Sequence, residues 1–90
     1  MNNKVYELKN GKGYIKEYES DGKLKFEGES LNGEKNGKGK EYEKGGLIFE
    51  GEYKNGKKNG KGKEYYNDEI IFEGEYKNND KYKGKFYKFN

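Results

Sequence analysis

The stretch FEGEYKNGKKNGKGKEYYNDEI, residues 49–70, decides the fold of this chain. Its first part alternates rings or glycine with glutamate, and its second part alternates glycine with lysine. Alternation with a period of two residues is typical of a β-strand, and glycines at this density disfavour a helix. The turn-forming run NGKKNG separates the two parts. The stretch is therefore predicted to form a β-hairpin with rings and glycines on one face and charges on the other.

The same pattern recurs along the chain. FEGE begins at Phe26, Phe49 and Phe72, and NGKGKEY begins at Asn36 and Asn59, so both motifs repeat after 23 residues. Partial copies lie near each end of the chain. A period of this size indicates a repeat architecture. We expect one all-β domain over residues 1–90, a single-layer elongated antiparallel meander of hairpins with units at about 4–22, 23–46, 47–69 and 70–90.

About eight strands are expected, with boundaries uncertain by roughly two to four residues, at 4–9, 12–18, 23–30, 37–42, 47–54, 60–66, 70–77 and 81–88. A four-residue loop at 55–58 would place Tyr53 opposite Gly60, and Glu50 and Glu52 opposite lysines. The same alignment pairs glutamate with lysine in the two flanking hairpins. It also places glycine opposite glycine in the middle of each hairpin, so we expect rings to cover a structural strip made of Gly28, Gly39, Gly51, Gly62, Gly74 and Gly84.

The missing residue types exclude most catalytic chemistry. The chain has no histidine and no cysteine, so imidazole bases, thiol nucleophiles, Cys/His zinc sites and disulfides are excluded. Carboxylate pairs such as Glu50 and Glu52 have lysines across the strands, which favours a solvated, register-setting face over a glycosidase pair. NGKG lacks the hydroxyl and the helix of a phosphate-binding loop. We expect no enzymatic activity, no cofactor and no metal site.

Charge and hydropathy favour a soluble, cytoplasmic chain. Lysines number 20 against 17 acidic residues, a net charge of +3. No apolar run approaches the roughly 20 residues of a membrane span, and the first residues do not form an apolar signal segment.

At these motifs the chain resembles the membrane occupation and recognition nexus (MORN) repeat family. The family's unit is a hairpin of the form YEGEW-KNG-K-x-x-GKG, followed by a tyrosine-containing strand and a DG-type turn; residues 49–70 match it almost position by position. Tyr53 and Tyr76 stand at the family's tryptophan, whereas Ser30 departs from it. The run KEYY is similar to a bacterial variant of the repeat, some members of which are labelled antitoxins. The resemblance implies a twisted meander that serves as a scaffold for protein partners or dimers.

We therefore expect a non-enzymatic protein-interaction module. Within this class, the small size suggests an inhibitor of another protein, such as an antitoxin or a phage-encoded, anti-CRISPR-like inhibitor of a defence nuclease. Tyrosine-rich surfaces are common at interfaces, so the candidate contact surface is the ring face. Its rings either bind a partner, which could be a second copy of the chain, or only cover their own backbone. The candidate residues are Phe49, Tyr53, Phe72 and Tyr76.

The basic C-terminal end offers an alternative. Residues 77–90 carry several lysines against the single acid Asp80. Such an end could attract nucleic acid or anionic lipid, although the absence of arginine disfavours nucleic acid and a few lysines attract a membrane only weakly. The lysines concerned are Lys81, Lys83, Lys85 and Lys88.

Overall fold

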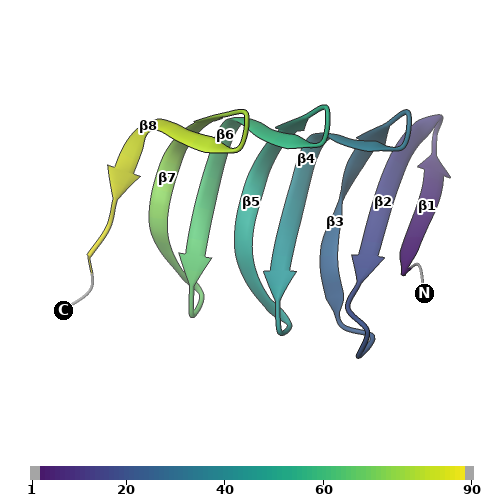
Figure 1. Ribbon diagram of the computed structural model, residues 1–90, viewed down its shortest axis with the longest axis horizontal. Helices are drawn as coiled ribbons and strands as arrows, with labels where there is room; N and C mark the ends of the chain where they lie inside the picture. Colours follow the sequence, from purple (N-terminus) through teal and green to yellow (C-terminus); the bar gives the residue numbers. More distant parts are fainter. Residues whose placement is uncertain (1–2, 89–90) are drawn as a thin grey trace.

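The computed structural model describes residues 3–88, which form eight strands and no helix. The strands pair in chain order within one antiparallel sheet, a meander 41 Å along its longest axis (Figure 1). The expected fold class is therefore confirmed. The strands are β1 (Lys4–Lys9), β2 (Lys12–Tyr18), β3 (Leu24–Leu31), β4 (Glu34–Glu43), β5 (Gly46–Lys54), β6 (Lys57–Tyr66), β7 (Glu69–Lys77) and β8 (Asp80–Phe86).

Tight turns connect the strands. Asn55 and Gly56, between β5 and β6, have φ angles of 52° and 82°. Positive φ at both central residues is the type I′ conformation, whose twist matches that of the flanking strands and which favours Asn-Gly. Further two-residue turns with positive φ follow β1, β3, β4, β6 and β7. The connection between β2 and β3 is longer, and there the Asp21 carboxylate accepts a hydrogen bond from the Lys23 amide at 2.9 Å.

The expected four-residue loop at 55–58 is wrong. Asn55 and Gly56 alone make the turn, so Tyr53 lies opposite Lys58 and not opposite Gly60. A bulge on β6 then restores the expected register, with Glu50 opposite Lys63. Each of the two central units contains two Asn-Gly pairs. In the second of these units, the first pair forms the turn, and the second, with Gly60 at φ 105°, lies in the bulge. As a result, β4 and β6 begin three residues earlier than expected, at Glu34 and Lys57.

The second Asn-Gly pair also joins neighbouring hairpins. Asn59 accepts a hydrogen bond through Oδ1 from the Asn78 amide at 3.4 Å, in the turn of the following hairpin. Asn36 accepts one from the Asn55 amide in the same way. The Gly56 amide also donates to the Lys35 carbonyl at 2.9 Å. The turns on this edge of the sheet are thus tied to one another from unit to unit.

The core is a row of rings on one face of the sheet. Phe26, Phe49 and Phe72 are each 1% exposed, and Tyr53 and Tyr76 pack between them, edge to face, with ring centroids 5.2–5.7 Å apart. Ile15 extends the buried row toward the N-terminus. Long lysine side chains cover the outer side of the rings, which explains how a one-layer sheet can bury them. The Nζ atoms of Lys35 and Lys58 lie 4.2 Å from the ring centroids of Phe26 and Phe49.

Glycine is required where the rings lie against the backbone. A Cβ on Gly62 would lie 2.7 Å from the Phe49 ring and 2.9 Å from the Tyr76 ring, and a Cβ on Gly51 would lie 2.7 Å from the Gly62 Cα. All three distances are shorter than ordinary contacts. The expected structural strip is therefore present, with Gly28 opposite Gly39, Gly51 opposite Gly62 and Gly74 opposite Gly84.

Candidate binding groove

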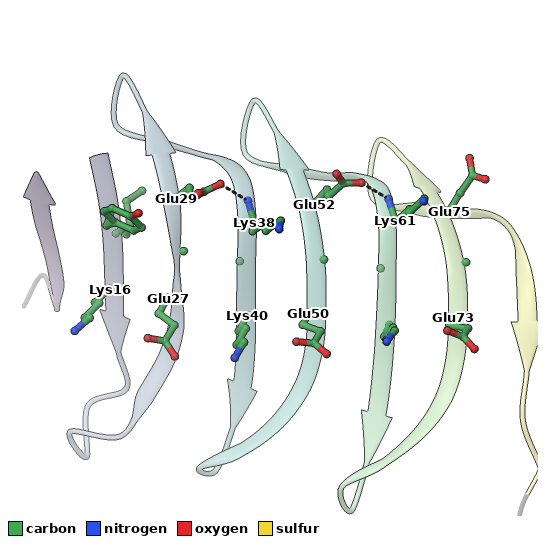
Figure 2. A pocket seen from close by; sticks show the side chains of 18 of the residues that line it. Lys16, Glu27, Glu29, Lys38, Lys40, Glu50, Glu52, Lys61, Glu73 and Glu75 are labelled. Carbon is green, nitrogen blue, oxygen red and sulfur yellow. Dashed lines mark hydrogen bonds between the residues drawn. The ribbon is translucent and has the colours of Figure 1, made fainter. Parts of the chain in front are cut away.

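A groove crosses the other face of the sheet, opposite the rings. Its volume is about 1080 Å³, and glycines of β3 to β8 lie along its middle. Side chains alternate between the two faces of a strand, and a Cβ on these glycines would point toward the rings. On the groove face, every strand therefore contributes bare backbone in the middle, with one charged side chain on either side of it. We call this feature the glycine groove. Figure 2 shows its labelled side chains in two rows, one of Glu29, Lys38, Glu52, Lys61 and Glu75 and the other of Lys16, Glu27, Lys40, Glu50 and Glu73.

Charge in the glycine groove is arranged in bands across its length. Both rows carry glutamate on β3, β5 and β7, and lysine on β4 and β6, so the sign alternates from strand to strand. Seven glutamates and seven lysines line the groove in total. Because neighbouring strands are only about 4.8 Å apart, opposite bands cancel at longer range. The groove can therefore discriminate between ligands that touch it but does not attract polyions from a distance.

Hydrogen bonds hold the groove carboxylates in place. Tyr42 donates through its hydroxyl to Glu27 at 2.7 Å, and Tyr65 donates to Glu50 in the equivalent position of the next unit. In the other row, Glu52 accepts from the Lys61 amide at 2.6 Å. The bonds from Lys38 to Glu29 and from Lys61 to Glu52 are dashed in Figure 2. Fixed acceptors lower the conformational entropy that a ligand must remove on binding.

These contacts shift the ionisation of the groups involved. Burial, together with the hydrogen bond to Glu27, raises the pKa of Tyr42 to about 12, and burial with the bond to Glu50 raises that of Tyr65 to about 12. On the ring face, burial and bonds to Glu41 and Glu64 raise the pKa values of Tyr53 and Tyr76. The four phenols therefore stay protonated in the folded chain at a pH where a free tyrosine, with a pKa near 10, ionises.

The raised pKa values of these tyrosines predict that the folded chain loses stability in alkali. The folded pKa values lie above the unfolded value of about 10. The contribution of these tyrosines to the free energy of unfolding is therefore fully present below pH 10, and it falls as the pH rises from about 10 to 12. Urea titrations followed by far-UV circular dichroism between pH 8 and 12 measure this fall. Tyr65→Phe removes one of these hydroxyls. The slope of the free energy of unfolding against pH should therefore become shallower, by up to the amount that corresponds to about one proton.

Tyr66→Phe is the matched control, because Tyr66 is 66% exposed. Lysines also lose their charge in this pH range, but equally in both variants. An identical pH dependence for the two variants would contradict the role given to the Tyr65 hydroxyl.

The four candidate rings do not line the glycine groove. Phe49 and Phe72 are 1% exposed, and Tyr53 and Tyr76 are 5% and 4% exposed, on the opposite face. The burial of these rings agrees with the second alternative, in which they cover their own backbone. A role for them in partner binding stays a prediction, with little accessible surface to support it.

The four candidate lysines at the C-terminal end do not form one cluster. Lys81 lies on the ring face, 5.5 Å from the Phe72 ring centroid, and contacts Glu64 at 3.1 Å. Lys85 lines the glycine groove on the other face, and Lys83 contacts Glu75 at 3.6 Å. Lys88 follows β8. The expected basic end is thus divided between the two faces of the sheet.

Sequence reasoning missed the glycine groove as a site. Within one hairpin, the motifs EGE and KGK predict only a solvated face that sets the strand register. The signal for a groove is glycine in register on successive strands with charged residues on both sides of it. Within residues 3–88, no group of histidine, cysteine or carboxylate side chains is arranged to hold a metal ion, and no helix is long and apolar enough to cross a membrane.

The family model of the MORN repeat matches residues 26–46 and 49–69. The first range contains most of the β3–β4 hairpin and the second most of the β5–β6 hairpin, so each match corresponds to one unit of the sheet. No curated protein and no solved structure matches the chain. MORN repeats generally mediate interactions with proteins or membranes. On these two matches and on the hairpin geometry of the matched residues, the chain contains two MORN repeats, at residues 26–46 and 49–69.

Proposed function

We propose that this chain is a non-enzymatic protein-binding module whose glycine groove receives an extended segment of a partner protein. The array would act as a single domain over residues 1–90, with units at about 4–22, 23–46, 47–69 and 70–90. The observation that carries the proposal is the continuous groove with fixed charges on both sides, which crosses the strands of several units.

The dimensions of the groove favour an extended chain over a helix. Its two rows stand two residues apart on each strand, about 6.7 Å, whereas a helix with its side chains is about 10–12 Å wide. From β1 to β8 the groove spans seven strand spacings, or about 34 Å. That length accommodates about ten residues in extended conformation, at about 3.3 Å each.

The charge of the groove favours a protein segment over a polyanion. With equal numbers of glutamates and lysines, the groove offers no net attraction to phosphates. A segment that carries both signs can instead pair with successive bands and leave its apolar side chains against the glycine backbone. Net affinity then comes from contact and desolvation more than from long-range charge.

The test is capture of a partner with groove and control variants. The groove variant carries Lys40→Gln, Glu50→Gln and Lys63→Gln, which remove charge but keep hydrogen-bonding groups. The matched control carries Lys25→Gln, Glu43→Gln and Lys57→Gln, with the same change in net charge at exposed positions outside the groove. We expect the groove variant to weaken the captured complex at least tenfold and the control to leave it unchanged.

A photo-reactive side chain locates the contact directly. Placed at position 40, it should cross-link to the partner, whereas at position 25 it should not. Equal effects of the two variants, or cross-links from position 25 alone, would reject the groove as the binding site. A nucleic-acid or anionic-lipid ligand would instead lose affinity steeply with salt and with neutralisation of Lys81, Lys83, Lys85 and Lys88.

A more specific form of the same proposal is that binding inhibits the partner protein. A small module that occupies a segment of another protein can block that protein's activity, as an antitoxin or an inhibitor of a defence nuclease does. The captured partner decides this point: its own activity, assayed with and without the chain, should fall when the glycine groove is intact and recover with the groove variant.

A further inference from the structure

Inside the sheet, every Lys-Gly-Lys triplet lies between two Glu-Gly-Glu triplets. On β4, Lys40 is opposite Glu27 of β3 and also opposite Glu50 of β5. On β6, Lys63 lies in the same way between Glu50 and Glu73. Each inner strand with a Lys-Gly-Lys triplet therefore pairs with a neighbouring strand along both of its edges. As a result, each lysine of the triplet has a carboxylate on both sides.

Strand β8 carries the same triplet with only one neighbour. Lys85 is opposite Glu73, Lys83 is opposite Glu75, and Gly84 is opposite Gly74, all on β7. Among the described residues no strand pairs with the other edge of β8, which lies at one end of the sheet (Figure 1). The whole strand is exposed. The second carboxylate row that flanks β4 and β6 is thus missing beside β8.

We propose that the open edge of β8 binds an extended acid-Gly-acid segment of another protein by β-strand addition. The segment would pair antiparallel with β8, place its carboxylates beside Lys83 and Lys85, and lengthen the sheet by one strand. Backbone hydrogen bonds supply affinity in this mode, and side chains at alternate positions supply specificity. This edge adjoins the end of the glycine groove, which Gly84 and Lys85 also line, but the inference does not depend on the function proposed for the groove.

Glycine between the two acids follows from the strands that occupy the equivalent place inside the sheet. The strand that follows β4 places Gly51 opposite Gly39, and the strand that follows β6 places Gly74 opposite Gly62. A segment that continues the same register therefore places glycine opposite Gly84.

Apolar contact is available at the same edge. Inner strands carry Glu41 and Glu64 where β8 carries Phe86, and these carboxylates accept the tyrosine hydroxyls of the next unit. Phe86 is 71% exposed, with its ring centroid 4.7 Å from that of Phe72. A partner side chain that leans over Gly84, as Tyr76 leans over Gly62 inside the sheet, would meet this ring.

A second copy of the chain is a poor occupant. Pairing β8 with β8 would place lysines beside lysines, which is unfavourable. The other open edge, β1, carries Glu7 as its single acid and contains no glycine. Lysines on an edge strand discourage pairing between copies, and here they leave the edge selective for an acidic strand.

The test uses synthetic peptides and the intact chain. The probe is a peptide with the sequence of residues 69–77, EIIFEGEYK, which contains the Glu-Gly-Glu triplet. We expect it to shift backbone amide resonances of β8 in two-dimensional NMR spectra and to slow hydrogen exchange at its open edge. A peptide with both triplet glutamates changed to lysine should bind at least tenfold more weakly, and so should a peptide N-methylated on the amides that face β8.

Reversing the charges on both sides makes the test specific. Lys83→Glu with Lys85→Glu should weaken binding of the parent peptide at least tenfold and restore binding of the lysine peptide. Since this variant also places Glu73 and Glu75 beside acids, Lys83→Gln with Lys85→Gln, checked by circular dichroism, provides a second measure of the loss. Absence of binding at 1 mM peptide, equal binding of the two peptides, or shifts confined to β1 or to the groove residues of β2 to β6 would overturn the proposal.

Discussion

Replacing Gly51 and Gly62 together with valine should unfold the array or lower its melting temperature by about 8 °C or more. Valine normally favours strands, but here each new Cβ would lie within 2.6–2.8 Å of the Lys61 carbonyl oxygen, the facing glycine or the Phe49 ring. Overpacking costs about 1–3 kcal/mol at one site, so two sites cost about 2–6 kcal/mol, and each kcal/mol corresponds to at least about 4 °C in a domain of this size. Thermal melts followed by circular dichroism measure the change.

Gly46→Val is the matched control for this prediction. Gly46 also lies in β5, but a Cβ there would meet only the Glu43 carbonyl oxygen, at an ordinary 3.6 Å. Its φ is not positive, so the backbone accepts valine without strain. We expect a melting temperature within a few degrees of the parent. A loss equal to that of the double variant would mean that glycine flexibility, and not contact with the rings, explains the strip.

Phe49→Ala should cost about 3–5 kcal/mol, the range measured when a buried phenylalanine is truncated. The ring is 1% exposed and lies edge to face with both Tyr53 and Tyr76, so its removal disturbs two units at once. It also removes the surface that the Lys58 side chain covers. Urea unfolding followed by circular dichroism gives the free energy.

The comparison for Phe49 is Tyr66→Ala. Tyr66 is another ring of the central units but is 66% exposed, so its truncation should change the free energy of unfolding by less than about 1 kcal/mol. Similar costs for the two variants would show that the row of rings is not the core. The same reasoning affects binding assays: Tyr53→Ser with Tyr76→Ser should disrupt the fold, so loss of a partner in that variant does not by itself identify a contact.

The regular part of this fold could be read directly from the sequence. Alternation of residues such as Phe49, Glu50 and Gly51, together with the repeat period, identified the strands, the single sheet and the central register. This succeeded because a one-residue shift would place charges on the ring face, which the pattern forbids.

The turns could not be predicted in the same way. Each of the two central units contains two Asn-Gly pairs, and both pairs satisfy the local preference for a tight turn. Only the structure shows that Asn55-Gly56 turns the chain, whereas Asn59-Gly60 forms a bulge. The bulge depends on partners in another hairpin, because Asn59 accepts a hydrogen bond from Asn78. Local sequence does not contain that contact.

The glycine groove could not be predicted from the sequence pattern of single hairpins. Glu50 was paired only with Lys63, yet it also lies opposite Lys40 of the preceding hairpin. Two-sided pairing turns separate hairpins into continuous rows, and the rows enclose the groove. The open edge of β8 becomes visible for the same reason, since a missing neighbour is recognised only where the inner strands have two.

The strictly sequential strand order has a kinetic consequence. Every strand pairs only with its neighbours in the chain, and no crossover connects distant segments. Folding rates fall as contacting residues lie further apart in sequence, which makes most all-β proteins slow. In this chain any hairpin can nucleate and the next strand can add to it, as in other linear repeat proteins. Folding should therefore be fast for an all-β protein, and each unit can order as soon as its two strands have left the ribosome.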